Sequence, residues 1–469
     1  MKRLFFCLAV LGVILTGCSK NDDGESDKPN NNGNEQPENP NEPELPELPA
    51  LPDPDDVCSA MDDLNFMAYC YENFDVNKDG KVSVTEANAA KEIYTTSSKW
   101  VSVKGIERFP NIEILSLNGS SITELDLRYN LKLKSISGYS SLLTTVLLPN
   151  TLTSIEKSAF KECASLIEIH FPASLTSIGV NAFYGCSSLT EINFPASLTS
   201  IGGSAFRGCS SLVEIHLSDN LTSIGEYAFS GCSSLTEINF PASLTSIRGF
   251  AFSGCSSLVE IHLPDNLTSI GERAFWSCSS LTEIHLPASL TWIGGSAFSG
   301  CSNLTKINLP DNLTSIGKTA FSGCSSLTEI HFPASLTSIG EYAFSGCSSL
   351  TEINLPASLA SIGGSAFSGC SSLTEINFPA SLTSIGESAF SFCSNLTEIH
   401  LPASLTSIGE GTFWSCSSLT EVICYALVPP KLNGFSNSTI ENLYVPAESI
   451  QAYKDSSWAI YFKNILPIE

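Results

Sequence analysis

Basic residues are scarce in this chain. Its 469 residues include 23 Lys and Arg against 48 Asp and Glu, which gives a formal net charge of −25 at pH 7. A protein that binds nucleic acid needs clustered positive charge to neutralise phosphates, and an acidic protein is repelled by anionic lipid headgroups. The composition therefore argues against nucleic acid and against anionic membrane surfaces as partners.

Long hydrophobic runs are also missing, apart from one at the N-terminus. Lys2 and Arg3 precede the apolar run from Phe5 to Leu15, which is too short for a spanning helix and has the length of a signal peptide. The sequence Leu-Thr-Gly-Cys that ends at Cys18 resembles a bacterial lipobox. This resemblance implies a lipoprotein signal peptide over residues 1–17 and a lipid on Cys18, which anchors the protein to the membrane. The alternative is an ordinary secretory signal with a chance cysteine.

Residue patterns that carry metal or catalytic chemistry are rare. The 17 cysteines include no C-x-x-C spacing, so the sequence predicts no zinc site. All six histidines recur at one repeated position, and no histidine is set apart beside a nucleophile and an orienting acid. We therefore predict that the protein is not an enzyme.

The chain instead repeats one pattern with a period of 23 residues. The pattern has a phenylalanine three residues before each cysteine, from Phe160 to Phe413. The twelve cysteines on this period are Cys163, Cys186, Cys209, Cys232, Cys255, Cys278, Cys301, Cys324, Cys347, Cys370, Cys393 and Cys416. Within a copy, Leu189, Ile192 and Phe194 show the L-x-x-L-x-L spacing of leucine-rich repeats, with one strand and a short turn or helix per repeat. The predicted fold is a repeat solenoid, because one copy cannot bury its apolar face and stacked copies share a continuous core.

Copies of the form LTEIxLPASLTSIGxxAFSGCSS resemble the BspA-type leucine-rich repeats of surface proteins in gut and oral Gram-negative anaerobes. The resemblance covers residues 150–424 and implies a surface-displayed solenoid that binds ligands, often in adhesion to host or partner-cell components. The run SKNDDGESD after Cys18 resembles the acidic export signal of surface lipoproteins in these bacteria. The expected location is the extracellular face of the outer membrane.

Composition divides the rest of the chain into further segments. The predicted divisions are a disordered acidic linker rich in Pro and Asn over 18–56, an EF-hand-like module over 57–98, divergent leucine-rich repeats over 99–150, the twelve-copy solenoid over 151–424, and a C-terminal cap over 425–469. The divergent repeats show the leucine-rich spacing twice at a shorter period, at Ile112, Leu115, Leu117 and at Ile122, Leu125, Leu127. The cap resembles that of relatives of the BspA-type proteins, and Trp458, Tyr461 and Phe462 are suited to cover the last open core.

The segment DVNKDGKVSVTE predicts one structural calcium ion. A calcium loop of twelve residues supplies oxygen ligands from positions 1, 3, 5, 7, 9 and 12 and has glycine at position 6, where Gly80 stands. The predicted ligands are Asp75, Asn77, Asp79, the carbonyl of Lys81, Ser83 and a bidentate Glu86. A helix is expected on each side, the second over residues 85–96. The alternative is an Asp/Asn-rich turn that binds nothing.

Side chains alternate across a strand, so the residues that flank Ile192 point outward. The repeats therefore predict one outward row of glutamates and a second row of His or Asn. The predicted ligand surface combines members of both rows with three tryptophans that depart from the repeat: Glu191, Asn193, Glu214, His216, Glu237, Glu260, His262, Glu283, His285, Trp276, Trp292 and Trp414. The alternative is a solvated face whose polar groups form hydrogen bonds along the stack.

Two functions fit this sequence. The first is a surface-anchored lipoprotein whose solenoid binds extracellular proteins in adhesion, and the alternative is a glycan-binding accessory protein in nutrient capture. A purely structural surface layer is a third interpretation. We expect the repeated cysteines to be buried thiols, because a disulfide would join two copies and break the repeat. Cys58 and Cys70 form a disulfide or remain free.

Overall fold

The computed structural model describes residues 45–138, 141–435 and 439–468. The predicted signal peptide, Cys18 and most of the predicted linker lie outside the described residues. The chain divides into two units, Met1–Glu47 and Leu48–Glu469, and the second unit contains all the elements below.

The second unit begins with a small helical module. It contains the 3-10 helix η1 (Val57–Ala60) and the helices α1 (Leu64–Phe74) and α2 (Val84–Ala89). The side chain of Asp63 caps α1, and Ser83 and Glu86 form a capping box at the start of α2. The exiting helix is shorter than the expected range 85–96, because α2 ends at Ala89 and strand β1 (Glu92–Tyr94) follows. Since β1 pairs with β2 of the solenoid, the stack begins within the range 57–98 assigned to the helical module.

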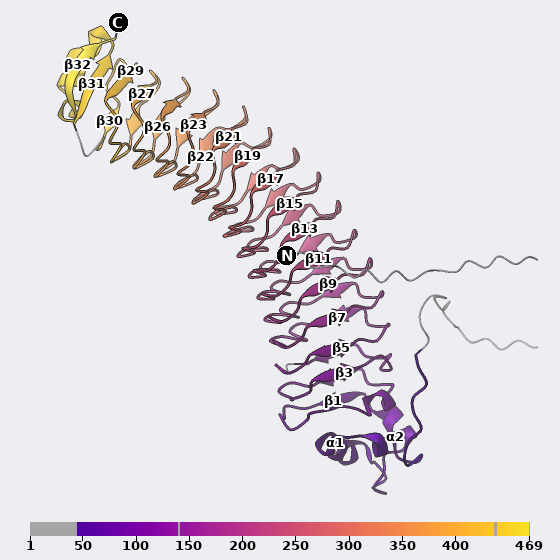
Figure 1. Ribbon diagram of the computed structural model, residues 1–469. Helices are drawn as coiled ribbons and strands as arrows, with labels where there is room; N and C mark the ends of the chain where they lie inside the picture. Colours follow the sequence, from indigo (N-terminus) through magenta and orange to yellow (C-terminus); the bar gives the residue numbers. More distant parts are fainter. Residues whose placement is uncertain (1–44, 139–140, 436–438, 469) are drawn as a thin grey trace, which may run out of the picture. The chain divides into compact units, whose positions relative to one another are not determined.

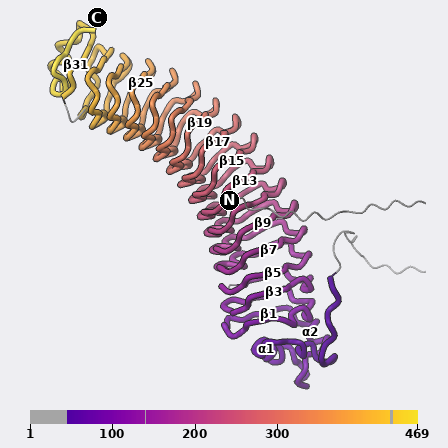
Figure 2. The backbone as a smooth tube through the Cα atoms, in the orientation of Figure 1, coloured from indigo at the N-terminus to yellow at the C-terminus, as the bar shows by residue number. Residues whose placement is uncertain are grey.

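The remaining chain winds into coils that lie side by side in the order of the sequence (Figure 1). Each 23-residue copy contributes two strands and a segment of turns, so a coil has three sides. We name them the first face, the second face and the third face. All pairing between successive coils is parallel and in register, as in Ile192 with Ile215 and Ile201 with Ile224. The same backbone path recurs from coil to coil in Figure 2.

The first face consists of three-residue strands in the repeats and longer strands near the C-terminus. Its strands are β3 (Glu124–Asp126), β5 (Thr145–Leu147), β7 (Glu168–His170), β9 (Glu191–Asn193), β11 (Glu214–His216), β13 (Glu237–Asn239), β15 (Glu260–His262), β17 (Glu283–His285), β19 (Lys306–Asn308), β21 (Glu329–His331), β23 (Glu352–Asn354), β25 (Glu375–Asn377), β27 (Glu398–Leu401), β29 (Glu421–Cys424), β31 (Ile440–Val445) and β32 (Phe462–Pro467).

The second face consists mainly of two-residue Ser-Ile strands. Its strands are β1, β2 (Ile114–Ser116), β4 (Ser135–Ser137), β6 (Ser154–Ile155), β8 (Ser177–Ile178), β10 (Ser200–Ile201), β12 (Ser223–Ile224), β14 (Ser246–Ile247), β16 (Ser269–Ile270), β18 (Trp292–Ile293), β20 (Ser315–Ile316), β22 (Ser338–Ile339), β24 (Ser361–Ile362), β26 (Ser384–Ile385), β28 (Ser407–Ile408) and β30 (Lys431–Leu432). The third face is formed by the turns that carry the repeated Phe and Cys.

This arrangement changes the interpretation of residues 99–150. The segment around Leu115 forms β2 on the second face, and the segment around Leu125 forms β3 on the first face. The two similar segments are therefore the two strands of one coil rather than two successive copies. The 3-10 helix η2 (Ile106–Arg108) precedes them.

The core is a set of ladders that run along the stack. The repeated Leu, Ile, Ala, Phe and Cys side chains are buried in every coil. The twelve phenylalanines from Phe160 to Phe413 stack in sequence, with adjacent ring centroids 5.1–5.7 Å apart and nearly parallel planes. Each coil thus buries its apolar side chains against the next coil, which is the physical basis of solenoid stability.

The C-terminal segment covers the last coil. Strand β31 pairs with β29, and β32 pairs with β31. The helix α3 (Ile450–Lys454) and the 3-10 helices η3 (Ala447–Ser449) and η4 (Ser457–Tyr461) complete it. Phe435 continues the phenylalanine ladder from Phe413 to buried Trp458 and Phe462, whereas Tyr461 is only partly buried. No helix in the described part of the chain is long and apolar enough to cross a membrane.

Candidate ligand-binding surfaces

The first face carries the predicted outward rows. In β9, Glu191 and Asn193 are exposed and Ile192 is buried, and the same alternation recurs along the stack. The parallel register places Glu191 beside Glu214 and Asn193 beside His216. The nine predicted Glu, Asn and His members of the ligand surface all lie on this face and are exposed: Glu191, Asn193, Glu214, His216, Glu237, Glu260, His262, Glu283 and His285.

Within a strand, the Asn or His side chain of one row contacts the Glu side chain of the other row two residues earlier. Nδ2 of Asn193 donates a hydrogen bond to Oε1 of Glu191 at 2.7 Å, and three further Asn–Glu pairs are 2.9–3.0 Å long. Each of the six histidines places Nε2 2.7–3.3 Å from the glutamate two residues earlier. These side-chain contacts run along the strand, whereas the alternative interpretation expected hydrogen bonds along the stack. Contacts along the stack are fewer, such as that between His400 and Tyr425. The reason is that identical carboxylates of adjacent coils repel each other, whereas Asn or His can donate to a neighbouring carboxylate.

One coil interrupts the acidic row. Lys306 stands in the glutamate position of β19, and its Nζ lies 3.2 Å from Glu329 in the next coil. Elsewhere in the row the glutamates from β7 to β29 lie next to one another. The first face is therefore an extended acidic surface with one internal ion pair.

The three tryptophans do not join this surface. Trp292 lies in β18 on the second face, while Trp276 and Trp414 follow the repeated phenylalanines on the third face. All three are exposed, Trp276 at 44% and Trp292 and Trp414 at 49%. The sequence could identify them as departures from the repeat, but the three-sided coil places them on sides other than that of the Glu and His rows.

The predicted calcium loop connects α1 and α2. Gly80 has φ +86, as a sharp turn at the sixth position requires, and Ser83 at the ninth position caps α2. The backbone and the order of oxygen-bearing side chains thus fit a calcium loop.

The carboxylates of this loop are hydrogen-bonded to backbone N–H groups. Asp75 accepts from Asp79 and Gly80, and Glu86 accepts from Val76, Asn77 and Ser83. These bonds from Ser83 and the loop lower the pKa of Glu86, so its side chain is an ionised carboxylate. In the described ranges, no three His, Cys, Asp or Glu side chains are grouped so as to hold a metal ion. Calcium binding stays a prediction, and it requires the carboxylates to exchange N–H partners for the ion.

The repeated cysteines are free and buried. From Cys186 to Cys416 each thiol donates to the carbonyl of the repeated Phe in the preceding coil, as Cys186 does to Phe160 at 3.1 Å. The thiol thus acts as a small core group that also satisfies a buried carbonyl. Cys58 and Cys70 are also free and buried.

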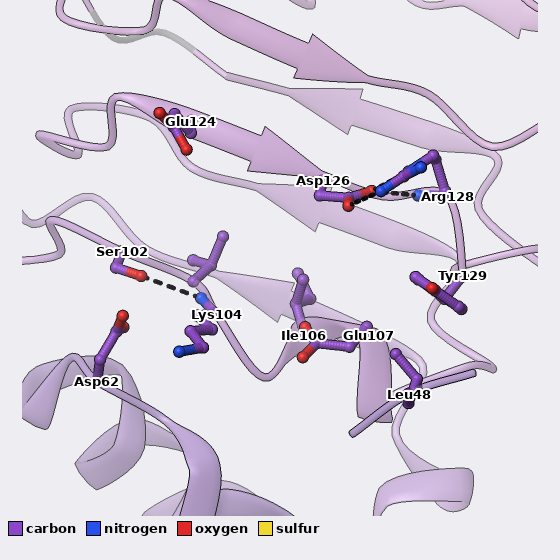
Figure 3. Close-up of a pocket in the computed structure, with 11 residues that line it drawn as sticks. Leu48, Asp62, Ser102, Lys104, Ile106, Glu107, Glu124, Asp126, Arg128 and Tyr129 are labelled. Atoms are coloured by element: carbon purple, nitrogen blue, oxygen red, sulfur yellow. Dashed lines mark hydrogen bonds and ion pairs between the residues drawn. The ribbon is translucent and has the colours of Figure 1, made fainter. Parts of the chain in front are cut away.

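A hollow that the sequence did not indicate lies where the first face begins (Figure 3). Its volume is about 390 Å³, and Glu124 and Asp126 of β3 line it together with Lys104 and Arg128. Arg128 donates from Nε and Nη2 to the two oxygens of Asp126, at 3.0 and 2.7 Å. Burial alone would raise the pKa of Asp126, but these bonds outweigh it and lower the pKa. Asp62 and Glu107 also line the hollow, so four carboxylates face two basic side chains and the hollow is acidic overall.

Comparison with known proteins agrees with this architecture. The profile of the BspA-type leucine-rich repeat region matches residues 132–249, 222–351 and 337–459. A crystal structure of a leucine-rich repeat protein from Bacteroides ovatus ATCC 8483 is 32% identical over 72% of this chain and 88% of that protein, with a TM-score of 0.63. A leucine-rich cell surface protein from Faecalibacterium prausnitzii A2-165 is 26% identical over 68% of this chain and 83% of that protein, with a TM-score of 0.42. No curated protein sequence matched the chain significantly.

These comparisons concern the same coils that form the three faces described above. The matched ranges run from the divergent coils into the C-terminal cap and cover well over half of the chain. The fold, the 23-residue period and the buried Phe and Cys ladders were predicted from the sequence, and the comparisons support the same conclusion. The chain belongs to the BspA-type leucine-rich repeat family, whose members are bacterial cell-surface proteins.

Proposed function

We propose that the protein is an adhesin of the bacterial cell surface and that its first face binds a basic region of an extracellular host or partner-cell protein. The observation that carries this proposal is the in-register row of exposed glutamates. Two carboxylates about 5 Å apart in water repel by only about 0.8 kcal/mol, so the row is tolerated and attracts cations. A basic partner can engage several coils at once, and linked weak contacts raise avidity by about 10² to 10⁴.

The first prediction concerns this row. We expect that a protein with Glu191, Glu214, Glu237 and Glu260 replaced by Gln binds its protein partner at least tenfold more weakly than the unchanged protein. The physical reason is loss of steering and of complementary charge, which also predicts weaker binding as salt rises. The measurement is surface plasmon resonance against a panel of immobilised extracellular matrix proteins, with polylysine as a reference for charge alone.

A matched control is available on the third face. Glu226, Glu272, Glu341 and Glu387 are also exposed, and their replacement by Gln changes the net charge equally. If this control loses as much affinity as the first variant, binding depends on net charge and the first face is not the site.

The anchor in this proposal is the lipid on Cys18, which holds the protein on the extracellular face of the outer membrane. Support comes from the lipobox-like sequence before Cys18 and the acidic run after it. A Cys18→Ala protein that remains processed and membrane-bound would exclude this anchor.

We also propose that the loop between α1 and α2 binds one structural calcium ion. Asp75, Asn77, Asp79, the Lys81 carbonyl, Ser83 and Glu86 would supply the ligands, all of them the oxygen atoms that calcium prefers. The ion would join the two helices of the module without taking part in ligand binding. Support comes from the order of ligands and the backbone of the loop.

The second prediction tests the ion. Calcium at 100 times its dissociation constant should stabilise the helical module by about 2.7 kcal/mol, and Glu86→Gln should remove most of this gain because it removes one carboxylate. Hydrogen exchange of residues 57–98 in the intact protein, with calcium and with chelator, measures the effect locally. Equal protection under both conditions would show that the loop binds no calcium.

A further inference from the structure

The third face carries a row of basic and aromatic side chains that departs from the repeat. Two positions of the repeat provide it, the second residue and the fifth residue before the cysteine. Ser is the commonest residue at each of them, and the coils of Cys301, Cys370 and Cys393 have Ser at both. Six successive coils instead provide the bulky side chains Lys161, Tyr184, Arg207, Tyr227, Phe250 and Arg273, which we call the third-face row, and the last of these coils also provides Trp276.

The members of this row contact one another in order. Nζ of Lys161 lies 5.5 Å from the Tyr184 ring centroid, and the guanidinium of Arg207 lies 5.9 Å from Tyr184 and 4.9 Å from Tyr227. The Tyr227 ring stacks on Phe250 with centroids 4.4 Å apart. Arg273 completes the row 5.2 Å from the Phe250 centroid. The cations are thus held over ring faces, a geometry in which the N–H edge of a guanidinium can bind an anion, as Arg273 Nη1 does with Glu272 at 3.5 Å.

A hollow of about 900 Å³ adjoins the C-terminal half of this row. It is lined by Arg207, Tyr227, Phe250, Arg273 and Trp276, together with Glu272, with Lys318 from a later coil and with hydroxyl groups of the repeat. Trp276 is 44% exposed and presents an indole in the same hollow as the two arginines. Aromatic rings, hydroxyls and guanidinium groups are side chains that can recognise an acidic sugar.

The aromatic members do not serve the core. Tyr227 and Phe250 are not among the described side chains that pack against the buried cluster. Both have positive φ, 59° and 58°, a left-handed conformation that is unfavourable for bulky residues and in which five of the other ten coils have Ser. The fold alone would favour the small residue, so these two positions are explained better by a ligand.

Arg248 is a further departure from the repeated sequence in the same coils. Other repeats from the second onward have glycine at this position, where an added Cβ would meet the backbone of the preceding coil, as at Gly225 with 2.4 Å to the nitrogen of Gly203. Beside Arg248 the pairing of β12 with β14 is reduced to Ile224 with Ile247, whereas the adjoining strands pair at two residues. A basic residue is therefore present two positions before Phe250 although it weakens the sheet.

The distribution of basic residues on the third face indicates which type of anionic ligand fits it. Of the seven Lys and Arg residues in 151–424, six lie in third-face loops and only Lys306 lies on the first face. Acidic residues are interspersed, and Glu272 lies 3.5 Å from Arg273. The arginines are therefore separated single charges and not a dense cluster. Such spacing suits isolated carboxylates on successive sugars better than a polysulfated chain.

We propose that the third-face row and Trp276 form a binding site for an acidic oligosaccharide that contains uronic acids. Arg207 and Arg273 bind carboxylates, and Trp276 with the neighbouring rings contacts the sugar. The site lies on a different side of the coil from the acidic row, so it is independent of the proposed protein-binding face. The solenoid then presents two ligand surfaces of opposite preference.

The third prediction tests this site by isothermal titration calorimetry of the intact protein with tetragalacturonate. Neutral methyl-esterified tetragalacturonate and a heparin-derived tetrasaccharide serve as comparison ligands. Tetragalacturonate should bind, and either comparison ligand should bind at least tenfold more weakly. Equal binding of the methyl ester would overturn the role of the carboxylates. Preference for the heparin fragment, which carries sulfate groups in addition to its uronic acids, would overturn the preference of the site for carboxylates over sulfates.

The repeat itself supplies variants that should fold normally. Phe250→Ser and Trp276→Ser restore the residue found in other coils, and Arg207→Ser does the same. Each should weaken tetragalacturonate binding at least tenfold, while Trp414→Ser, at the position of Trp276 in a distant coil, should leave it unchanged. Unaltered binding in the first three variants would place the sugar elsewhere, and absence of binding by the unchanged protein would refute the site without affecting the proposed role of the first face.

Discussion

In reducing buffer, the free energy of unfolding of the solenoid is expected to fall steeply as pH rises above 9. The described residues of the repeats include no buried acid–base pair that could cause this fall. The cause is the cysteine ladder. Burial raises the pKa of each thiol from Cys186 to Cys416 above its ordinary value of 9.0, to about 12 for Cys324, Cys370 and Cys416. A thiol in the core is neutral, and its ionisation requires exposure to water.

The direction of this effect follows from proton binding. Since the folded pKa lies above the unfolded pKa, the folded state retains protons that the unfolded state releases between pH 9 and pH 12. The stabilisation by neutral thiols is fully present below pH 9 and is lost as pH rises through this window. Each thiol contributes about 1.4 kcal/mol per pH unit, so eleven thiols that unfold together give about 15 kcal/mol per unit. The measurement is urea unfolding, followed by circular dichroism, at pH 7, 8, 9 and 10.

A serine variant separates the thiols from other groups that titrate in alkali. Replacement of Cys232, Cys255, Cys278 and Cys301 by Ser keeps a hydroxyl donor for the preceding Phe carbonyl but removes ionisation. The slope of unfolding free energy against pH should fall by about a third. An unchanged slope would show that tyrosines or lysines, and not the ladder, cause the alkaline instability.

The inward and outward positions were predictable because they depend on local alternation. Ile192 had to be buried and Glu191 exposed once a strand was assigned, and the structure confirms both. The periodic Cys and Phe were likewise predictable as core residues, since a strict period in apolar residues requires each copy to occupy the same environment.

The grouping of outward residues into sites was not predictable from spacing. The chain direction changes between the strands of a coil, and these turns place Trp276 and Trp292 on different faces. Arg207 and Tyr227 occupy different positions of the repeat, yet they are in contact because successive coils lie against each other. The end of α2 also depended on tertiary structure, because residues 92–94 pair with β2 instead of extending the helix.

The second large effect concerns the phenylalanine ladder. Phe275→Ala is expected to destabilise the protein by about 3–5 kcal/mol, the usual loss when a fully buried Phe is truncated. Phe275 is 0% exposed, and its ring lies between Phe252 and Phe298 with both centroids 5.5 Å away. The substitution leaves a cavity at two interfaces between coils, and these interfaces hold a solenoid together.

Phe250 provides the matched control, since it belongs to the coil directly before that of Phe275 but lies on the third face. Phe250→Ser should change the free energy of unfolding by less than about 1 kcal/mol, because the ring leaves no core cavity and the left-handed conformation favours Ser. Urea midpoints at pH 7 compare the two variants. A loss below about 1 kcal/mol for Phe275→Ala would show that the ladder is not the main stabilising core, and a large loss for Phe250→Ser would assign its ring to the fold instead of to the sugar site.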